Sequence, residues 1–156
     1  DGLQATIHVE PGFPLVACHG AYLRQVFDNL VSNALKYAKP GVPPELTISS
    51  QTGKDKVCFA VQDRGIGIPR DQRSRVFQPF VRLGQTAAQG SGIGLAIVQR
   101  IVELYGGRVW IEGAEGEGCT VKFTLPWLSQ ESGATGHAVP DANFSEVVDV
   151  SQNDLF

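Results

Sequence analysis

The chain contains no methionine, and no apolar run approaches the roughly 18 residues that a membrane-spanning helix needs. Without methionine the sequence has no start residue, so we expect a piece of a longer or processed protein. Its beginning, Asp1-Gly-Leu-Gln4, lacks the basic and then apolar pattern of a secretion signal. We therefore expect no membrane contact by this segment and a cytoplasmic location, with a parent protein that is either membrane-anchored or soluble.

Cysteine and histidine are scarce and scattered. Cys18, Cys58 and Cys119 show neither C-x-x-C spacing nor a neighbouring histidine in ligand spacing, which argues against a zinc site. The three histidines are far apart in the sequence as well. Small buried thiols in a reducing compartment are the better interpretation of the cysteines.

A large excess of charge is also missing. The formal net charge is −3, so there is no general basic field for nucleic acid, and we expect no nucleic-acid partner. With 156 residues, 42% of them apolar and 19% charged, the chain has the composition of a globular protein with a real core.

The composition changes after Pro126. Residues 129–156 contain five acidic residues and no lysine or arginine. Such a segment is typical of a flexible acidic extension. We predict a globular domain over residues 1–128 and an extension over residues 129–156, with a short docked strand within Phe144–Val150 as the alternative.

Hydrophobic periodicity predicts a mixture of strands and helices. Alternating stretches predict strands over residues 5–10, 15–18, 46–51, 56–62, 108–112 and 119–125. Helical periodicity covers Gly20 to about Ala38 and Ile93–Tyr105, and Pro69 favours a short helix over Arg70–Phe77. Short turns between the third and fourth strands, and between the last two, predict two hairpins.

One face of the first helix carries an unusual polar stripe. At about 100° per residue, Asn29, Asn33, Lys36 and Tyr37 lie on one side, next to the apolar face. A single asparagine there would indicate only a solvated face, but four such residues favour a lined pocket. Amide oxygens can ligate Mg²⁺, lysine can meet phosphate, and a tyrosine ring can meet a base.

Two glycine-rich segments lie at element boundaries, one after a predicted strand and one at the start of a predicted helix. Asp63-Arg-Gly65-Ile-Gly67-Ile68 comes at the end of a strand, where glycine lets the backbone approach a ligand closely. Gly90-Ser91-Gly92-Ile-Gly94-Leu95 opens the second long helix, whose free N–H groups favour an anion. Neither segment fits the Walker or G-x-G-x-x-G pattern, so any phosphate site is of another kind. A plain turn and a flexible hinge are the alternatives.

A fourth segment combines two aromatic residues with a cation. Phe77-Gln-Pro-Phe80 is followed by Arg82, close to the glycine-rich stretch 84–92, which we predict to be mobile. Aromatic residues in such a place are usually core anchors. Arg82 is either a solvated charge or a group that reaches the phosphates.

In chain order, these four segments resemble the N, G1, F and G2 boxes of the catalytic and ATP-binding domain of two-component sensor histidine kinases. Phe77–Phe80 resembles the F box, and Gly90–Leu95 resembles the G2 box. The resemblance covers about residues 5–126 and leaves out the acidic extension. It implies an α+β fold of the Bergerat type, a two-layer sandwich. In that fold a mixed, mostly antiparallel sheet of about five strands is covered on one face by three helices. It also implies ATP and Mg²⁺ as cofactors.

The resemblance implies roles for individual residues. Asn33 would ligate Mg²⁺, Asn29 would help hold the metal and its waters, and Asp63 would accept a hydrogen bond from the exocyclic amine of adenine. Asn29, Lys36 and Arg82 would be the catalytic residues. The whole expected nucleotide site is Asn29, Asn33, Lys36, Tyr37, Asp63, Gly65, Gly67, Ile68, Phe77, Phe80, Gly90, Ser91, Gly92, Gly94, Leu95 and Thr120.

The implied activity is transfer of the ATP γ-phosphoryl group to a histidine on a separate dimerisation domain of the same parent, with a response regulator receiver domain as a further partner. No histidine here has the context of the family's acceptor motif, so the enzyme would be incomplete without that domain. We expect the isolated domain to be monomeric. ATP hydrolases of the same fold have the motif E-x-x-x-N in this helix. This chain has Asn29 at the position of the glutamate, and its amide cannot act as a general base.

Other functions remain open at this point. A nucleotide-binding regulatory module of a mainly phosphatase-type sensor is the first alternative. A related-fold ATPase, a serine-directed anti-sigma kinase and a non-nucleotide scaffold are weaker ones.

Overall fold

A computed structural model describes residues 4–82, 91–127 and 148–149. Its centre is a five-stranded sheet in the order β1-β3-β4-β6-β5. The strands are β1 (Thr6–Val9), β3 (Glu45–Thr52), β4 (Lys56–Asp63), β5 (Val109–Glu112) and β6 (Cys119–Pro126). Only β1 and β3 pair in parallel, and the other pairs are antiparallel. This confirms the predicted mixed, mostly antiparallel sheet and both hairpins.

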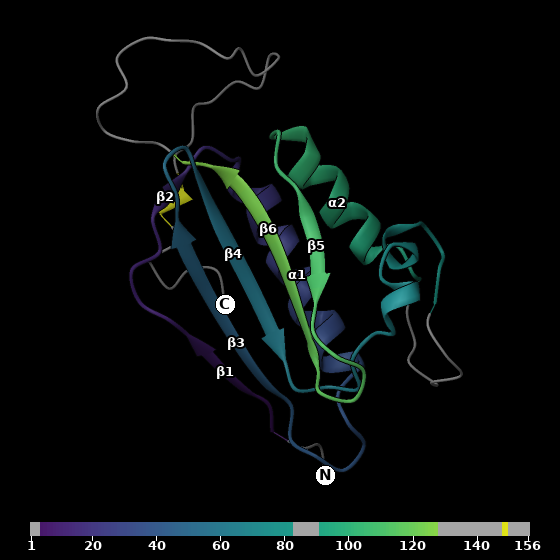
Figure 1. Cartoon of the computed structure of the whole chain (residues 1–156). Helices are drawn as coiled ribbons and strands as arrows, with labels where there is room; N and C mark the ends of the chain where they lie inside the picture. Colours follow the sequence, from purple (N-terminus) through teal and green to yellow (C-terminus); the bar gives the residue numbers. More distant parts are fainter. Residues whose placement is uncertain (1–3, 83–90, 128–147, 150–156) are drawn as a thin grey trace, which may run out of the picture.

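The helices lie on one face of this sheet, as the sequence predicts for a two-layer α+β fold (Figure 1). Helix α1 spans Gly20–Lys36 and helix α2 spans Gly94–Leu104, and the two pack against each other. The third predicted helix forms as two single 3-10 turns, η1 (Arg70–Gln72) and η2 (Arg75–Phe77). Within the described parts of the chain, no helix has both the length and the apolar character needed to span a membrane.

Strand β2 (Leu15–Val16) lies outside the main sheet. It pairs antiparallel with β7 (Val148–Asp149), so Leu15 faces Asp149 and Val16 faces Val148. This pairing falls within the segment for which the sequence allowed a docked strand. The remainder of the extension, and most of the stretch predicted to be mobile, lie outside the described residues.

Three phenylalanine rings form the middle of the core, between the sheet and α1. Phe59 of β4 stacks on Phe123 of β6 at 5.0 Å, and Phe27 of α1 meets both rings edge-on at 5.8 and 5.6 Å. All three are almost completely buried. Strand alternation explains the arrangement, because Phe59 and Phe123 are directly opposed in the register and therefore point to the same face.

We expect Phe59→Ala to lower the free energy of unfolding by about 3–5 kcal/mol, because it removes a buried ring and leaves a cavity. Urea denaturation measures the change. Phe80→Ala is the matched control, since Phe80 is 76% exposed and its loss should change stability by less than about 0.5 kcal/mol. Equal losses in the two variants would contradict the core described above.

Candidate functional site

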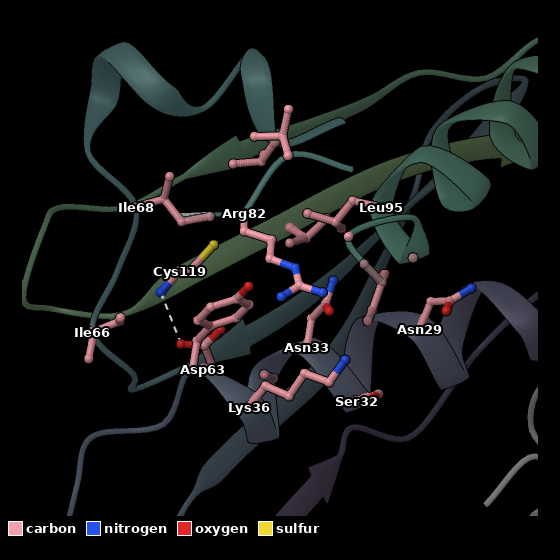
Figure 2. Close-up of a pocket in the computed structure, with 18 of the residues that line it drawn as sticks. Asn29, Ser32, Asn33, Lys36, Asp63, Ile66, Ile68, Arg82, Leu95 and Cys119 are labelled. Carbon is pink, nitrogen blue, oxygen red and sulfur yellow. Dashed lines mark hydrogen bonds between the residues drawn. The ribbon is translucent and has the colours of Figure 1, made fainter. Parts of the chain in front are cut away.

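A cavity of about 660 Å³ opens between the C-terminal half of α1, the start of α2 and the adjoining ends of β4 and β6 (Figure 2). Val61 of β4 and Val121 of β6 contribute to its lining beside the sheet. Ile66 and Ile68, which follow β4, contribute further apolar surface. A partly apolar cavity with a few convergent polar groups is the usual form of a small-molecule site.

The polar stripe of α1 faces this cavity. Asn29, Asn33, Lys36 and Tyr37 all line it, as the helical periodicity predicts. Asn29 also contacts the beginning of α2, since its Oδ1 lies 3.2 Å from where a Cβ on Gly94 would be. The stripe therefore lies between the sheet and the second helix.

Asp63 lies at the end of the cavity where β4 ends and β6 begins. It is the last residue of β4 and pairs with Cys119, the first residue of β6. Its Oδ1 accepts hydrogen bonds from the backbone N–H of Gly65 at 2.8 Å and of Cys119 at 3.2 Å. Burial raises the pKa of this carboxyl above its ordinary value of 3.8, although the two N–H groups act in the opposite direction.

Gly65 holds the loop after β4 close to the end of α1. A Cβ on Gly65 would lie 2.3 Å from the carbonyl oxygen of Tyr37, so no other residue fits without movement of the backbone. The next residue, Ile66, donates its N–H to the same oxygen at 3.0 Å. Gly65 thus supports the site from behind, while Gly67 and Ile68 line the cavity itself.

The two ends of the cavity differ in charge. Arg82 and Lys36 contribute cationic groups, and Figure 2 shows Arg82 reaching toward the side where Asn33 and Lys36 lie. At the end formed by Asp63, the lining carboxylates are those of Asp63 and Glu115. A ligand with an anionic part is therefore favoured in one orientation over the reverse.

The glycine-rich segment before α2 lines the cavity in its described part. Ser91, Gly92, Gly94 and Leu95 all contribute to the lining. The Gly92 carbonyl accepts the N–H of Phe80 at 2.9 Å, which ties this segment to the one after η2. Gly90, also expected in the site, lies outside the described residues.

Besides Gly65, three expected site residues in the described part of the chain do not line the cavity. Phe77 is buried in the core, and Phe80 is 76% exposed with a left-handed φ of 66°, so neither ring lines the cavity. Thr120 does not line the cavity either, because neighbouring strand residues point to opposite faces. Cys119 and Val121 of β6 face the cavity, and the Cys119 N–H makes the contact with Asp63.

Several lining residues were missed in the sequence. Ser32 and Gln72 are ordinary polar residues without a pattern, and Val76 and Ile97 resemble any core position. Glu115 belongs to the turn between β5 and β6, which approaches the cavity only in the folded chain. No signal in a single sequence marks these residues.

Comparison with known proteins assigns the chain and its fold to a family. A family model described as "Histidine kinase-, DNA gyrase B-, and HSP90-like ATPase" matches residues 19–129. The adaptive-response sensory kinase SasA of Synechococcus elongatus is 45% identical over 105 residues, which cover 67% of this chain and 27% of that protein.

Solved structures agree with this match. Full-length ShkA in complex with AMPPNP superposes with a TM-score of 0.67 at 31% identity, over 81% of this chain and 26% of that one. The mycobacterial sensor histidine kinase MprB has a TM-score of 0.64 at 28% identity, over 80% and 81% of the two chains.

The chain belongs to this ATPase family and is similar to the ATP-binding catalytic domains of sensor histidine kinases. It spans between 13% and 35% of the length of the curated relatives compared with it.

The raised pKa of Asp63 predicts a pH-dependent stability. A carboxyl whose pKa rises on folding favours the folded state fully below its ordinary value of 3.8, and this contribution is lost as the pH rises through the folded-state pKa. Asp63→Asn removes the buried charge while its amide oxygen can still accept both N–H bonds. We therefore expect the variant to melt at a higher temperature than the wild type at pH 7, with the difference shrinking toward pH 3.8.

Thermal unfolding of the nucleotide-free protein from pH 3.5 to 8 measures this effect. Asp28→Asn controls for the loss of one carboxylate, because Asp28 lies on the exposed side of α1. If the melting temperatures of the wild type and the Asp63→Asn variant differed by the same amount at every pH, the prediction would be contradicted.

Proposed function

We propose that this chain binds ATP with Mg²⁺ and transfers the γ-phosphoryl group to a histidine on a separate dimerisation domain of its parent protein. One observation carries the proposal: the cavity has a held carboxylate at one end and two asparagines with Lys36 and Arg82 at the other. The family match and the likeness to ShkA in complex with AMPPNP support it.

The Asp63 end is the site for adenine. Within the described residues both N–H donors bond to Oδ1, so Oδ2 is available to accept the exocyclic amine of the base. Guanine has a carbonyl at the corresponding position and would face the carboxylate with an acceptor. Ile66, Ile68 and Tyr37 supply apolar surface for the ring.

The opposite end is the site for the phosphates. Lys36 and Arg82 supply positive charge, and the segment from Ser91 into α2 supplies backbone N–H groups at a helix start. Such fixed groups stabilise charge that moves during phosphoryl transfer and position the reacting atoms.

The residues beside the phosphate end fit a magnesium ion. Asn29, Asn33 and Ser32 line the cavity with neutral oxygen donors, which suit a hard cation that keeps phosphate oxygens and waters as its other ligands. The described residues contain no group of three or more His, Cys, Asp or Glu side chains in metal-binding arrangement. Asn33 would be the direct ligand, and the ion would neutralise part of the phosphate charge.

Asn29 favours transfer over hydrolysis. An amide has no basic lone pair at neutral pH, so it cannot take a proton from an attacking water. In transfer, the bond from the γ-phosphorus to the bridging oxygen breaks, a phosphorus–nitrogen bond to the imidazole forms, and ADP leaves. The imidazole proton passes to a base, which we place on the acceptor domain.

We propose that this domain acts together with two others. Its partners are the histidine-bearing domain of the same parent and a response regulator receiver domain, and the domain alone is monomeric. Residues 1–128 form the catalytic unit, and residues 129–156 form an acidic extension. The three free thiols are compatible with a reducing, cytoplasmic location.

We expect the protein to bind ATP with a dissociation constant in about the micromolar to millimolar range and GTP much more weakly. Asp63→Asn should weaken ATP binding by about 10- to 100-fold, because a hydrogen bond to a charged acceptor is lost. Calorimetric titration with Mg²⁺ present measures both. Asp55→Asn is the control, since Asp55 lies in the turn at the far end of β4. Equal affinity for ATP and GTP would contradict the assignment of Asp63.

We expect phosphorylation of a supplied acceptor domain by this chain in trans, with [γ-³²P]ATP as the donor. Arg82→Met should lower the initial rate by about 10- to 100-fold through the loss of a charge-assisted contact to phosphate. Arg24→Met, on the exposed face of α1, should leave the rate unchanged. ATP binding without transfer to its acceptor domain would instead favour a regulatory module.

A further inference from the structure

The cavity wall at the Asp63 end consists of two loops that pack directly on each other. The first, Arg64–Pro69, follows β4, and the second, Gly113–Gly118, joins β5 to β6. The N–H of Gly116 donates to the carbonyl oxygen of Ile66 at 2.8 Å. Gly118 lies so close that a Cβ there would come within 2.1 Å of the Asp63 carbonyl oxygen. The position of one loop therefore determines that of the other.

Arg73 connects the two loops from outside the cavity. It follows η1 and is half-buried, and it does not line the cavity. Its Nε donates to the carbonyl oxygen of Ile68 in the first loop at 3.2 Å. One of its terminal nitrogens donates to the carbonyl oxygen of Gly113, where the second loop begins.

On the basis of the function proposed above, we propose that Arg73 is a positioning residue for recognition of the nucleotide base. The second loop leads directly into Cys119, whose N–H holds Asp63 Oδ1. By holding Gly113 and Ile68 together, Arg73 determines where this N–H lies. It also sets the position of the part of the cavity wall to which Ile66, Gly67 and Ile68 contribute. In the proposed complex this part of the wall contacts the base. Arg73 thus acts on the orientation of the Asp63 carboxylate without touching the nucleotide.

The chemistry of the guanidinium group explains why an arginine suits this position. Its N–H donors point in fixed, different directions in one plane, so a single side chain can serve two carbonyl oxygens on separate loops. A lysine carries its donors on a single nitrogen at the end of a flexible stem and cannot bridge them equally well. Arg70 and Arg75, in the same segment, are exposed and provide matched comparisons.

Titration of the complete chain with ATP and with GTP, each with Mg²⁺, tests the proposal. We expect Arg73→Met to raise the dissociation constant for ATP about threefold to tenfold, as expected for a disturbed hydrogen bond. GTP binding should change little, so the preference for ATP narrows. Arg73→Lys should restore part of the preference, and Arg70→Met should leave it at the wild-type value.

Arg82→Met distinguishes this effect from a loss of phosphate binding. It should weaken ATP and GTP by similar factors and keep their ratio, because Arg82 belongs to the other end of the cavity. A second measurement is backbone hydrogen exchange in nucleotide-free protein. Arg73→Met should speed exchange at Gly116 and Cys119, and exchange at Val57, at the far end of β4, should stay unchanged.

An Arg73→Met variant that folds and keeps both the wild-type ATP preference and the wild-type exchange at Cys119 would overturn the proposal alone. A wild type that binds neither nucleotide would overturn the proposed function and this inference together. If Arg73→Met does not fold, Arg73→Lys carries the test, and a wild-type ATP preference and exchange at Cys119 in that variant would overturn the positioning role.

Discussion

The antiparallel pairing of β4 with β6 is the constraint on which both the core and the cavity depend. In the middle of this pair, Phe59 and Phe123 stack under α1. At its end, Asp63 lies opposite Cys119, and the backbone N–H of Cys119 holds the carboxylate. A slip of one residue in this register would turn every side chain of one strand to the opposite face. The same register therefore determines the packing of the domain and the position of the Asp63 carboxylate.

The site is built at some expense of stability. Asp63 is a partly buried carboxylate whose pKa burial raises, so its charged form destabilises the nucleotide-free domain near neutral pH. The loop behind it requires Gly65, which approaches the end of α1 too closely for a side chain. Groups that are held for a ligand in this way are usual at functional sites, where stability and function are in conflict.

Separation of charge across one cavity connects the elements. Lys36 comes from α1, Arg82 from the segment after η2, and Asp63 from β4, so three parts of the chain must meet before the cavity has an anionic and a cationic end. Neither loop of the wall is held by regular secondary structure alone. The Gly116 N–H bonds directly to the Ile66 carbonyl oxygen, and Arg73, a residue outside the cavity, adds a side-chain hydrogen bond to each loop.

Local patterns were enough to foresee much of this arrangement. The period of α1 places Asn29, Asn33 and Lys36 on one stripe next to its apolar face, and alternation places Asp63 at a strand end, because both patterns depend on neighbours a few residues away. Contacts between distant segments could not be read in this way. Cys119 lines the cavity whereas Thr120 and Phe80 do not, because strand register and loop placement follow from packing of the whole chain. The residue types and their spacing thus decided which chemistry is possible, and only long-range packing decided which side chains meet around the cavity.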